Sequence, residues 1–258
     1  MSYRTRPTSH SYLNMTGNID ASDRSDASHA ETIDWNAFWR DADDADRQFA
    51  TPSTHHVRDL LAQFFDAKGV PESFASVGCG PGVVAFDVAT RHPETTVHGY
   101  DAATSIVAEN RERASDEGVA NAHFEQAALP DLDLDRQFET VLCYGTMSYV
   151  EDSAAALRAL YDAVEPGGHL VLGYVNDGYR RHLQRVLDDP VAHGKDPDSF
   201  DAAEFQRRWR LVLDGESTLT YDAIHDAVGT WPRSFWEVAD YPEERWAWED
   251  VPIVWLPK

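Results

Sequence analysis

The sequence of 258 residues has few cysteines and no long apolar segment. Its two cysteines, Cys79 and Cys143, are too few for a disulfide framework or a zinc cluster, and we expect small buried side chains. No run of about 18 apolar residues occurs, so no transmembrane helix and no membrane partner is expected. The N-terminal segment lacks the apolar core of a secretory signal, and we therefore expect a cytoplasmic protein.

Positive charge is also scarce. The chain has 45 acidic and 22 basic residues, a formal net charge of −23, and only three lysines. Acidic residues spread along the whole chain, a halophilic composition that resembles cytosolic proteins of salt-accumulating organisms. In molar salt the Debye length is about 3 Å, so repulsion between surface carboxylates is screened. Because no stripe of lysine or arginine is present, we expect no nucleic-acid partner.

Strand-like and helix-like segments alternate along most of the chain, which predicts a doubly wound, mostly parallel α/β sheet. The expected strands are 73–79, 95–101, 122–127, 138–145 and 169–175, and the expected helices between them are 82–93, 102–118 and 153–168. Two further strand-like segments, 234–240 and 251–258, have no helix between them and predict an antiparallel pair. The fold class is thus a seven-stranded Rossmann-like sheet with a final antiparallel strand.

The remaining segments surround this sheet. Residues 1–30 are rich in Ser, Asp, Thr and Asn, and we expect them to be disordered. Residues 31–258 are expected to form a single domain. It begins with two helices, one carrying Trp35, Phe38 and Trp39 at helical spacing and one near 53–69. Two helices rich in Arg and Asp form a helical insertion at about 177–215.

Three glycines, Gly78, Gly80 and Gly82, lie between the first strand and the next helix in the stretch FASVGCGPGVVAF. Ligands of open parallel sheets bind at such turns, and glycine lets the backbone approach a ligand closely and adopt positive φ. A dinucleotide fingerprint would be G-x-G-x-x-G, but this spacing is G-x-G-x-G and Val83 occupies the third glycine position. The pattern therefore predicts a nucleotide-like cofactor and weakens the pyrophosphate interpretation.

The stretch VGCGPG after a strand resembles the first motif of class I S-adenosylmethionine-dependent methyltransferases, and the resemblance covers about residues 50–176. Asp101 ends the second strand, as the ribose-binding acid of that family does. FEQAALPDL resembles the adenine-side segment, and FETVLCYGTMSYVED resembles the fourth strand and its active-site loop. LRALYDAVEPGGHLVLGYV resembles the helix, the Pro-Gly-Gly turn and the fifth strand. The resemblance implies S-adenosyl-L-methionine (SAM) as the cofactor.

The resemblance also implies a set of cofactor-binding residues. Asp101 would accept the two ribose hydroxyls, or would instead cap the next helix. Ser76 stands where the family usually has an acid, and the usual adenine-side Asp is absent, so Gln126, Glu125 or the backbone would bind the adenine. The predicted set is Ser76, Gly78, Cys79, Gly80, Gly82, Asp101, Ala102, Gln126, Ala127, Ala128, Tyr144 and Gly145.

The sequence leaves the catalytic residue unknown, because the sulfonium of this cofactor activates its own methyl group. The candidates for a base or a positioning group are His55, His56, Tyr144, Tyr149, Tyr174 and His225. No clustered pattern of metal ligands is seen, so no metal is expected. The loop CYGTMSY differs from the (D/N)-P-P-(Y/F) motif of nucleic-acid amino-methylating enzymes, and with the acidic surface this favours a small-molecule acceptor.

Two features could shape the acceptor site. The aromatic N-terminal helix and the inserted helices could build a lid, or could simply add to the core. The arginines of RRWR at 207–210, with Arg180 and Arg181, could bind an anionic substrate or could pair with the many aspartates. The leading prediction is a SAM-dependent methyltransferase. The alternatives are a non-catalytic SAM-binding protein and an NAD(P)-dependent oxidoreductase.

Overall fold

The computed structural model describes residues 33–43, 46–47, 50–51, 54–240 and 248–258, and the expected disorder of residues 1–30 lies outside these ranges. A seven-stranded sheet has the order β3-β2-β1-β4-β5-β7-β6. The strands are β1 (Ser73–Val77), β2 (Thr96–Asp101), β3 (Ala122–Gln126), β4 (Phe138–Cys143), β5 (Val164–Gly173), β6 (Arg233–Ser234) and β7 (Ile253–Pro257).

Neighbouring strands from β3 to β5 pair in parallel, and β7 pairs antiparallel with both β5 and β6. This confirms the predicted mostly parallel sheet with a final antiparallel strand. The chain runs from β1 outward to β3 and then returns to the other side of β1 with β4. Strand order therefore reverses between β1 and β4, and a ligand crevice is expected beyond the carboxyl ends of these strands.

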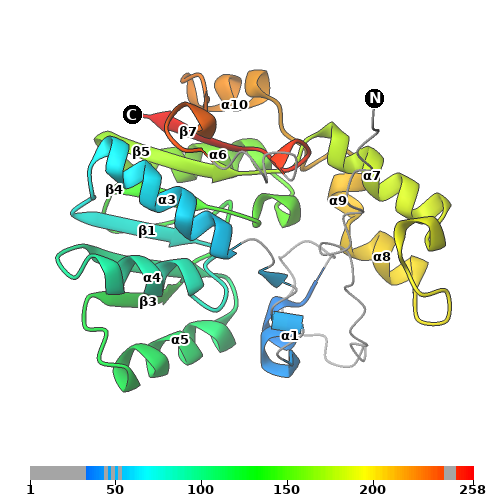
Figure 1. The fold of residues 1–258 in the computed structure, drawn as a ribbon, viewed down its shortest axis with the longest axis horizontal. Helices are drawn as coiled ribbons and strands as arrows, with labels where there is room; N and C mark the ends of the chain where they lie inside the picture. Colours follow the sequence, from blue (N-terminus) through cyan, green and yellow to red (C-terminus); the bar gives the residue numbers. More distant parts are fainter. Residues whose placement is uncertain (1–32, 44–45, 48–49, 52–53, 241–247) are drawn as a thin grey trace, which may run out of the picture.

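Helices cover both faces of the sheet (Figure 1). Apolar side chains of α3, α4 and α5 join one buried cluster, and those of α6 and α10 join a second cluster on the opposite face. This two-sided cover explains the continuous apolar runs of the central strands. The helices are α3 (Thr54–Lys68), α4 (Val83–Arg91), α5 (Thr104–Asp116), α6 (Ser153–Asp162) and α10 (Tyr221–Val228).

The remaining helices lie beyond the carboxyl ends of the parallel strands (Figure 1). Helix α1 (Trp35–Asp41) packs Phe38 and Trp39 against Ala103 and Ile106 at the start of α5. The inserted helices form a small buried cluster of their own around Leu183. They are α7 (Asp177–Asp188), α8 (Ala202–Arg208) and α9 (Arg210–Leu213), with the 3₁₀ turn η2 (Val191–His193) between α7 and α8.

Three predicted elements differ from the structure. The strand predicted at 234–240 is wrong: β6 ends at Ser234, whose hydroxyl accepts a hydrogen bond from Trp236 N (3.3 Å) and so starts the 3₁₀ turn η3 (Phe235–Glu237). The helix predicted at 153–168 ends at Asp162, and its Pro-Gly-Gly segment belongs to β5. A Cβ at Gly168 would lie 2.5 Å from Glu139 O, so glycine permits this close pairing with β4. The second of the two helices predicted in the insertion at about 177–215 is interrupted at Trp209 and forms two short helices.

Within the described ranges, no helix combines the length and the apolar character that crossing a lipid bilayer requires.

Candidate functional site

The three-glycine turn between β1 and α4 lies at the carboxyl edge of the sheet, against the end of β2. Gly78 N and Cys79 N both donate to Tyr100 O, at 2.7 and 2.9 Å. Gly78 has φ +69°, and a Cβ there would lie 1.9 Å from Thr146 Oγ1. Glycine at this position thus allows both the left-handed conformation and close contact with the segment that follows β4.

Asp101 joins this turn to the start of α5. Its Oδ2 accepts from Gly80 N (2.8 Å) and its Oδ1 accepts from Ala103 N (3.0 Å). Burial raises the pKa of the carboxyl, and the backbone N–H groups of Ala103, Gly80 and Ala102 oppose that shift. An ionised carboxylate offers about four lone-pair sites, so these two bonds leave capacity for a diol. The capping role and the predicted ribose role are therefore compatible.

The adenine-side residues lie beside Asp101. Gln126 is the register partner of Asp101, its Nε2 donates to Ala102 O (3.2 Å), and Ala127 N donates to Asp101 O (3.1 Å). Ala128 follows and is half-buried. Glu125 has a different environment, with its Oε1 3.3 Å from His98 Nδ1 at a surface hollow of about 600 Å³ beside β3. The structure thus brings Gln126 to the site and places Glu125 elsewhere.

The residues after β4 form the opposite wall. The ring of Tyr144 packs against Gly173, where a Cβ would lie 2.2 Å from it, and against Trp248 with a centroid distance of 5.8 Å. Gly145 has φ +75° and no heavy atom within 4 Å of a built Cβ, so it borders open space. This open position beside the glycine turn is where the methionine end of the cofactor is predicted.

Two further predicted residues, Ser76 in β1 and Cys79 in the turn, lie next to the glycines. Ser76 is buried inside β1, between Gly99 and Leu142 of the neighbouring strands. Burial and the charge of Asp101 raise the pKa of the Cys79 thiol well above its ordinary value. Cys79 is therefore a neutral packing group rather than a nucleophile.

The sequence interpretation missed Asn110 of α5. Its side chain is almost fully buried, and its Nδ2 donates to Gly80 O at 2.8 Å. Asn110 continues the apolar face formed by Ile106, Val107 and Ala114. A polar residue at an apolar helical position was the available signal, because such a residue needs a buried partner.

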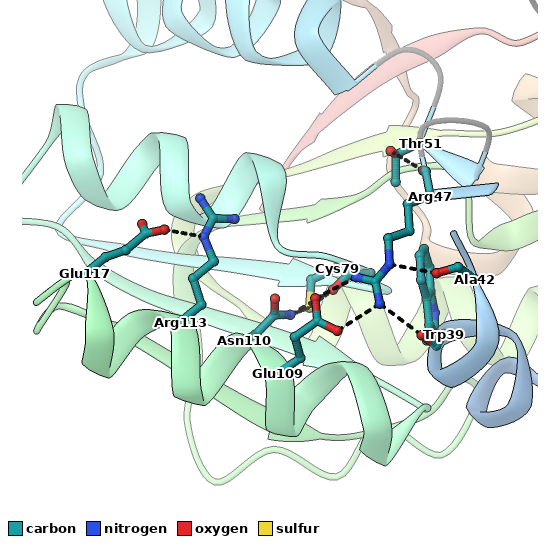
Figure 2. A network of polar contacts seen from close by, with 10 residues as sticks. Trp39, Ala42, Arg47, Thr51, Cys79, Glu109, Asn110, Arg113 and Glu117 are labelled. Carbon is teal, nitrogen blue, oxygen red and sulfur yellow. Dashed lines mark hydrogen bonds and ion pairs between the residues drawn. The ribbon is translucent and has the colours of Figure 1, made fainter. Parts of the chain in front are cut away.

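Helix α1 covers the glycine turn, and hydrogen bonds of Arg47 connect it to α5. The ring of Trp39 comes within 3.2 Å of a Cβ built on Gly80. Arg47 holds Glu109 of α5 through two hydrogen bonds (2.6 and 2.9 Å) and also donates to Trp39 O (3.0 Å) and Ala42 O (3.3 Å), as Figure 2 shows. The predicted lid is thus connected to the wall that carries Asn110.

The catalytic candidates occupy different places. Tyr149 lies beyond β4 in the 3₁₀ turn η1 (Met147–Tyr149), with ring centroids 4.9 Å from Trp35 and 5.6 Å from Trp209. His55 and His56 belong to the first turn of α3, and in Figure 1 this end of α3 is the one nearer to α1. The side chain of His55 lies outside the described residues, and His56 is half-buried.

Two other candidates are not brought to the site. Tyr174 is buried in the cluster under α6 and α10. His225 of α10 stacks on Trp231 at a centroid distance of 4.0 Å. These two residues have packing roles in the structure. Among the residues that the structure describes, no group of three or more His, Cys, Asp or Glu side chains is placed to hold a metal ion.

Comparison with known proteins agrees with the geometry. A family model described as a methyltransferase domain matches residues 74–168, from β1 into β5. A ubiquinone biosynthesis O-methyltransferase of Pseudomonas paraeruginosa is 26% identical over 171 residues, which are 63% of this chain and 70% of that protein. A trans-aconitate 2-methyltransferase of Streptomyces coelicolor is 29% identical over 174 residues, 65% of this chain and 52% of that protein.

Solved structures share the fold. The plantazolicin methyltransferase BamL, solved with a triazolic desmethylPZN analog and SAH (S-adenosylhomocysteine), has a TM-score of 0.58 at 12% identity, covering 87% of this chain and 94% of that one. The protein PKMT2 from Rickettsia typhi has a TM-score of 0.55 at 14% identity, covering 77% and 52%. At such identities the likeness concerns the arrangement of helices and strands.

Proposed function

The chain is a class I S-adenosylmethionine-dependent methyltransferase, and we propose that it methylates a small-molecule acceptor held between the β4 loop, α1 and the inserted helices. The relatives' names, ubiquinone biosynthesis O-methyltransferase and trans-aconitate 2-methyltransferase, both refer to small molecules. The absence of a basic stripe in a chain of net charge −23 also supports a small acceptor over a nucleic acid. The resemblance does not extend to the fingerprint of NAD(P)-dependent oxidoreductases.

The observation that carries the cofactor assignment is the bond between Asp101 and Gly80 at the point where strand order reverses. The residues fit an adenosyl group, since Asp101 retains acceptor capacity for two ribose hydroxyls and Gly145 borders open space. In this assignment Ala102, Gln126, Ala127 and Ala128 surround the adenine. Ser76, Gly78, Cys79, Gly80, Gly82, Tyr144 and Gly145 surround the ribose and the methionine end.

Bound SAM supplies an electrophilic methyl group, and the protein's contribution is to align an acceptor lone pair with the S–CH₃ axis and to exclude water. The rings of Trp35, Trp39 and Tyr149 contact one another between α1 and the β4 loop, and we assign this aromatic wall to the acceptor site. Tyr149 and Tyr144 are the candidates for orienting the acceptor, because both follow β4 at the edge where the cofactor's methionine end is assigned. Transfer of the methyl group to a protonated acceptor also requires that the acceptor lose its proton. His56, acting as a base, or solvent would accept this proton.

We also propose that the enzyme works in the cytoplasm of a salt-accumulating cell. The composition supports this, because the carboxylates outnumber the basic groups twofold and require screening. Activity is therefore expected to rise with KCl toward molar concentration. A purified enzyme that is most active at low salt would contradict this proposal.

The proposed function is tested by measuring SAH formation with a panel of small-molecule acceptors in molar KCl. Turnover of at least one acceptor, with transfer of label from methyl-labelled SAM, is the expected result. A protein that binds SAM and transfers no methyl group to any acceptor class would favour a non-catalytic SAM-binding role.

A further inference from the structure

Apart from the exposed Arg185, the arginines of the inserted helices divide into two kinds. Most are paired with nearby carboxylates, as surface charges usually are in an acidic protein. The paired arginines are Arg180 and Arg181 with Asp177, Arg207 with Glu204, and Arg210 with Asp214 and Glu216. Arg208 belongs to the other kind: it is only 8% exposed, and its Nε and Nη2 are buried without a hydrogen-bond partner in the part of the chain that the structure describes.

Arg208 lies where the insertion meets the rest of the site. Its guanidinium carbon is 5.8 Å from the ring centroid of Phe38 on α1. Its charge lowers the pKa of Tyr179 on α7, while burial and the nearby Tyr149 and Tyr144 raise that pKa. Tyr179 is thus within electrostatic range of Arg208 and of both tyrosines that follow β4. Arg208 therefore lies near the residues of α1 and the β4 loop that border the space assigned to the acceptor.

The described surroundings do not neutralise Arg208. A guanidinium keeps its charge at all ordinary pH values, so it cannot avoid the cost of burial by losing a proton. The cation–π contact with the Phe38 ring contributes about 2 kcal/mol when desolvated, and it supplies no negative charge and no hydrogen-bond acceptor for Nε and Nη2. Asp250, whose charge also acts on Tyr179, is not a hydrogen-bond partner of the Arg208 Nε or Nη2 among the described residues. A buried charge of this kind normally has an anionic partner.

The positions of Nε and Nη2 on the Arg208 guanidinium indicate the shape of the anion that would bind there. Nε and Nη2 are on the same edge of the planar guanidinium, and this edge donates two parallel hydrogen bonds to the two oxygens of a carboxylate. Aromatic rings of Tyr149, Trp209 and Tyr179 line the same region, with centroid distances of 5.6 and 5.7 Å to Trp209. A small organic acid with a planar anionic group matches both features.

We propose that Arg208 binds a carboxylate of the methyl acceptor, so that the substrate is a small organic acid. This inference rests on the proposed methyltransferase function. The carboxylate held by Arg208 is an anchor and not the methylated group, because hydrogen bonds to both of its oxygens lower their nucleophilicity. The anchored acid then presents a second nucleophilic group toward the β4 loop.

The test is calorimetric titration of the full chain, saturated with SAH, in 2 M KCl. The probes are mono-, di- and tricarboxylates, benzoate and trans-aconitate among them, each matched with its neutral amide or ester. Contacts between exposed charges are screened at this salt concentration, where the Debye length is about 3 Å or less, whereas a desolvated pair is not. We expect at least one acid to bind at least tenfold more tightly than its neutral counterpart.

Three variants locate the effect. Arg208→Met should weaken binding of that acid at least tenfold and leave SAH affinity within twofold of wild type. Arg208→Lys keeps the charge but loses the planar donor edge, so it should give an intermediate loss. Arg207→Met is the matched control, because Arg207 is adjacent, half-exposed and already paired with Glu204. It should bind the acid like wild type.

The possible outcomes separate this inference from the proposed function. Equal binding of acids and neutral partners, or unchanged acid binding in folded Arg208→Met, would overturn the inference while SAH binding upholds the cofactor site. Failure of SAH to bind would overturn the proposed function, and acid titration of the free protein would still test Arg208. If Arg208→Met does not fold, the folded Arg208→Lys variant decides, and wild-type affinity in that variant overturns the inference.

Discussion

Replacing Asp101 by Asn tests whether this residue binds ribose or only organises the backbone. The carboxylate accepts hydrogen bonds from Gly80 N and Ala103 N at 2.8 and 3.0 Å, and an asparagine side chain has one oxygen for these two donors. Losing one hydrogen bond to a charged group costs about 1.5–3 kcal/mol. Relief from burying a charge offsets part of this cost, so we expect the free energy of unfolding to fall by about 1–2 kcal/mol.

The effect on cofactor binding is larger if Asp101 also accepts the ribose hydroxyls. Loss of one charge-assisted bond of about 1.5–3 kcal/mol corresponds to about a 10- to 150-fold weaker affinity for SAH. Burial raises the pKa of Asp101 above its ordinary value of 3.8. Because binding requires the ionised carboxylate, wild-type affinity should fall on acidification at a pH above that value, and the Asn variant should lack this transition.

The assay is calorimetric titration of wild type and Asp101→Asn with SAH and with its 2′-deoxyribose analogue. Wild type should bind the deoxy analogue at least tenfold more weakly, and the variant should show little difference between the two ligands. The coupling energy of this cycle isolates the contact between side chain and hydroxyl from any general loss of stability. A coupling energy near zero would refute the ribose assignment and leave Asp101 a purely structural residue.

Three further predictions concern the glycine turn, the fastening of α1 and a buried lysine. Gly78→Ala should destabilise the fold by several kcal/mol more than Gly118→Ala in thermal unfolding. Both glycines have positive φ, but only a Cβ at position 78 would clash with Thr146 (1.9 Å). Equal losses of stability in the two variants would contradict this. Arg47→Met should speed proteolysis of α1 and weaken SAH binding severalfold, and a variant with wild-type proteolysis would show that the Glu109 contact does not hold α1. Burial lowers the pKa of Lys195 from 10.5 to about 8, so at this side chain the unfolded state binds more protons between these pH values, and Lys195 should contribute a rise in the free energy of unfolding across that window. Burial raises the pKa of the Cys79 and Cys143 thiols, and these groups act in the opposite direction above pH 9. The difference between wild type and Lys195→Met in urea titrations should therefore rise with pH, and a constant difference would contradict this.

Much of the fold could be predicted because local pattern and tertiary structure agree. Apolar strands such as β1 are buried on both faces, and turn residues mark their ends, so alternation alone predicts the parallel sheet. The prediction of a strand at 234–240 was wrong because most of its apolar residues lie in and after a 3₁₀ turn. Phe235 fills the core by stacking on Phe64 (5.3 Å), and the Ser234 hydroxyl starts a turn that periodicity does not reveal.

The cofactor side of the site could be predicted from short-range order, since the glycines and Asp101 end adjacent strands. Its assignment to individual cofactor atoms stays a prediction. The acceptor side depends on contacts between segments far apart in the chain, such as Trp35 with Tyr149 (4.9 Å). The arginines of RRWR have the same chemistry in sequence, and only the fold distinguishes buried Arg208 from paired Arg207.

The central claim is that the glycine turn and Asp101 bind an adenosyl cofactor. Its most direct test is calorimetric titration of the wild-type chain and Asp101→Ala with SAM, SAH and NAD in molar KCl. The account predicts micromolar binding of both adenosyl ligands by wild type, loss of that binding in the variant, and no binding of NAD. A folded wild-type protein that binds neither adenosyl ligand, or that prefers NAD, would contradict it.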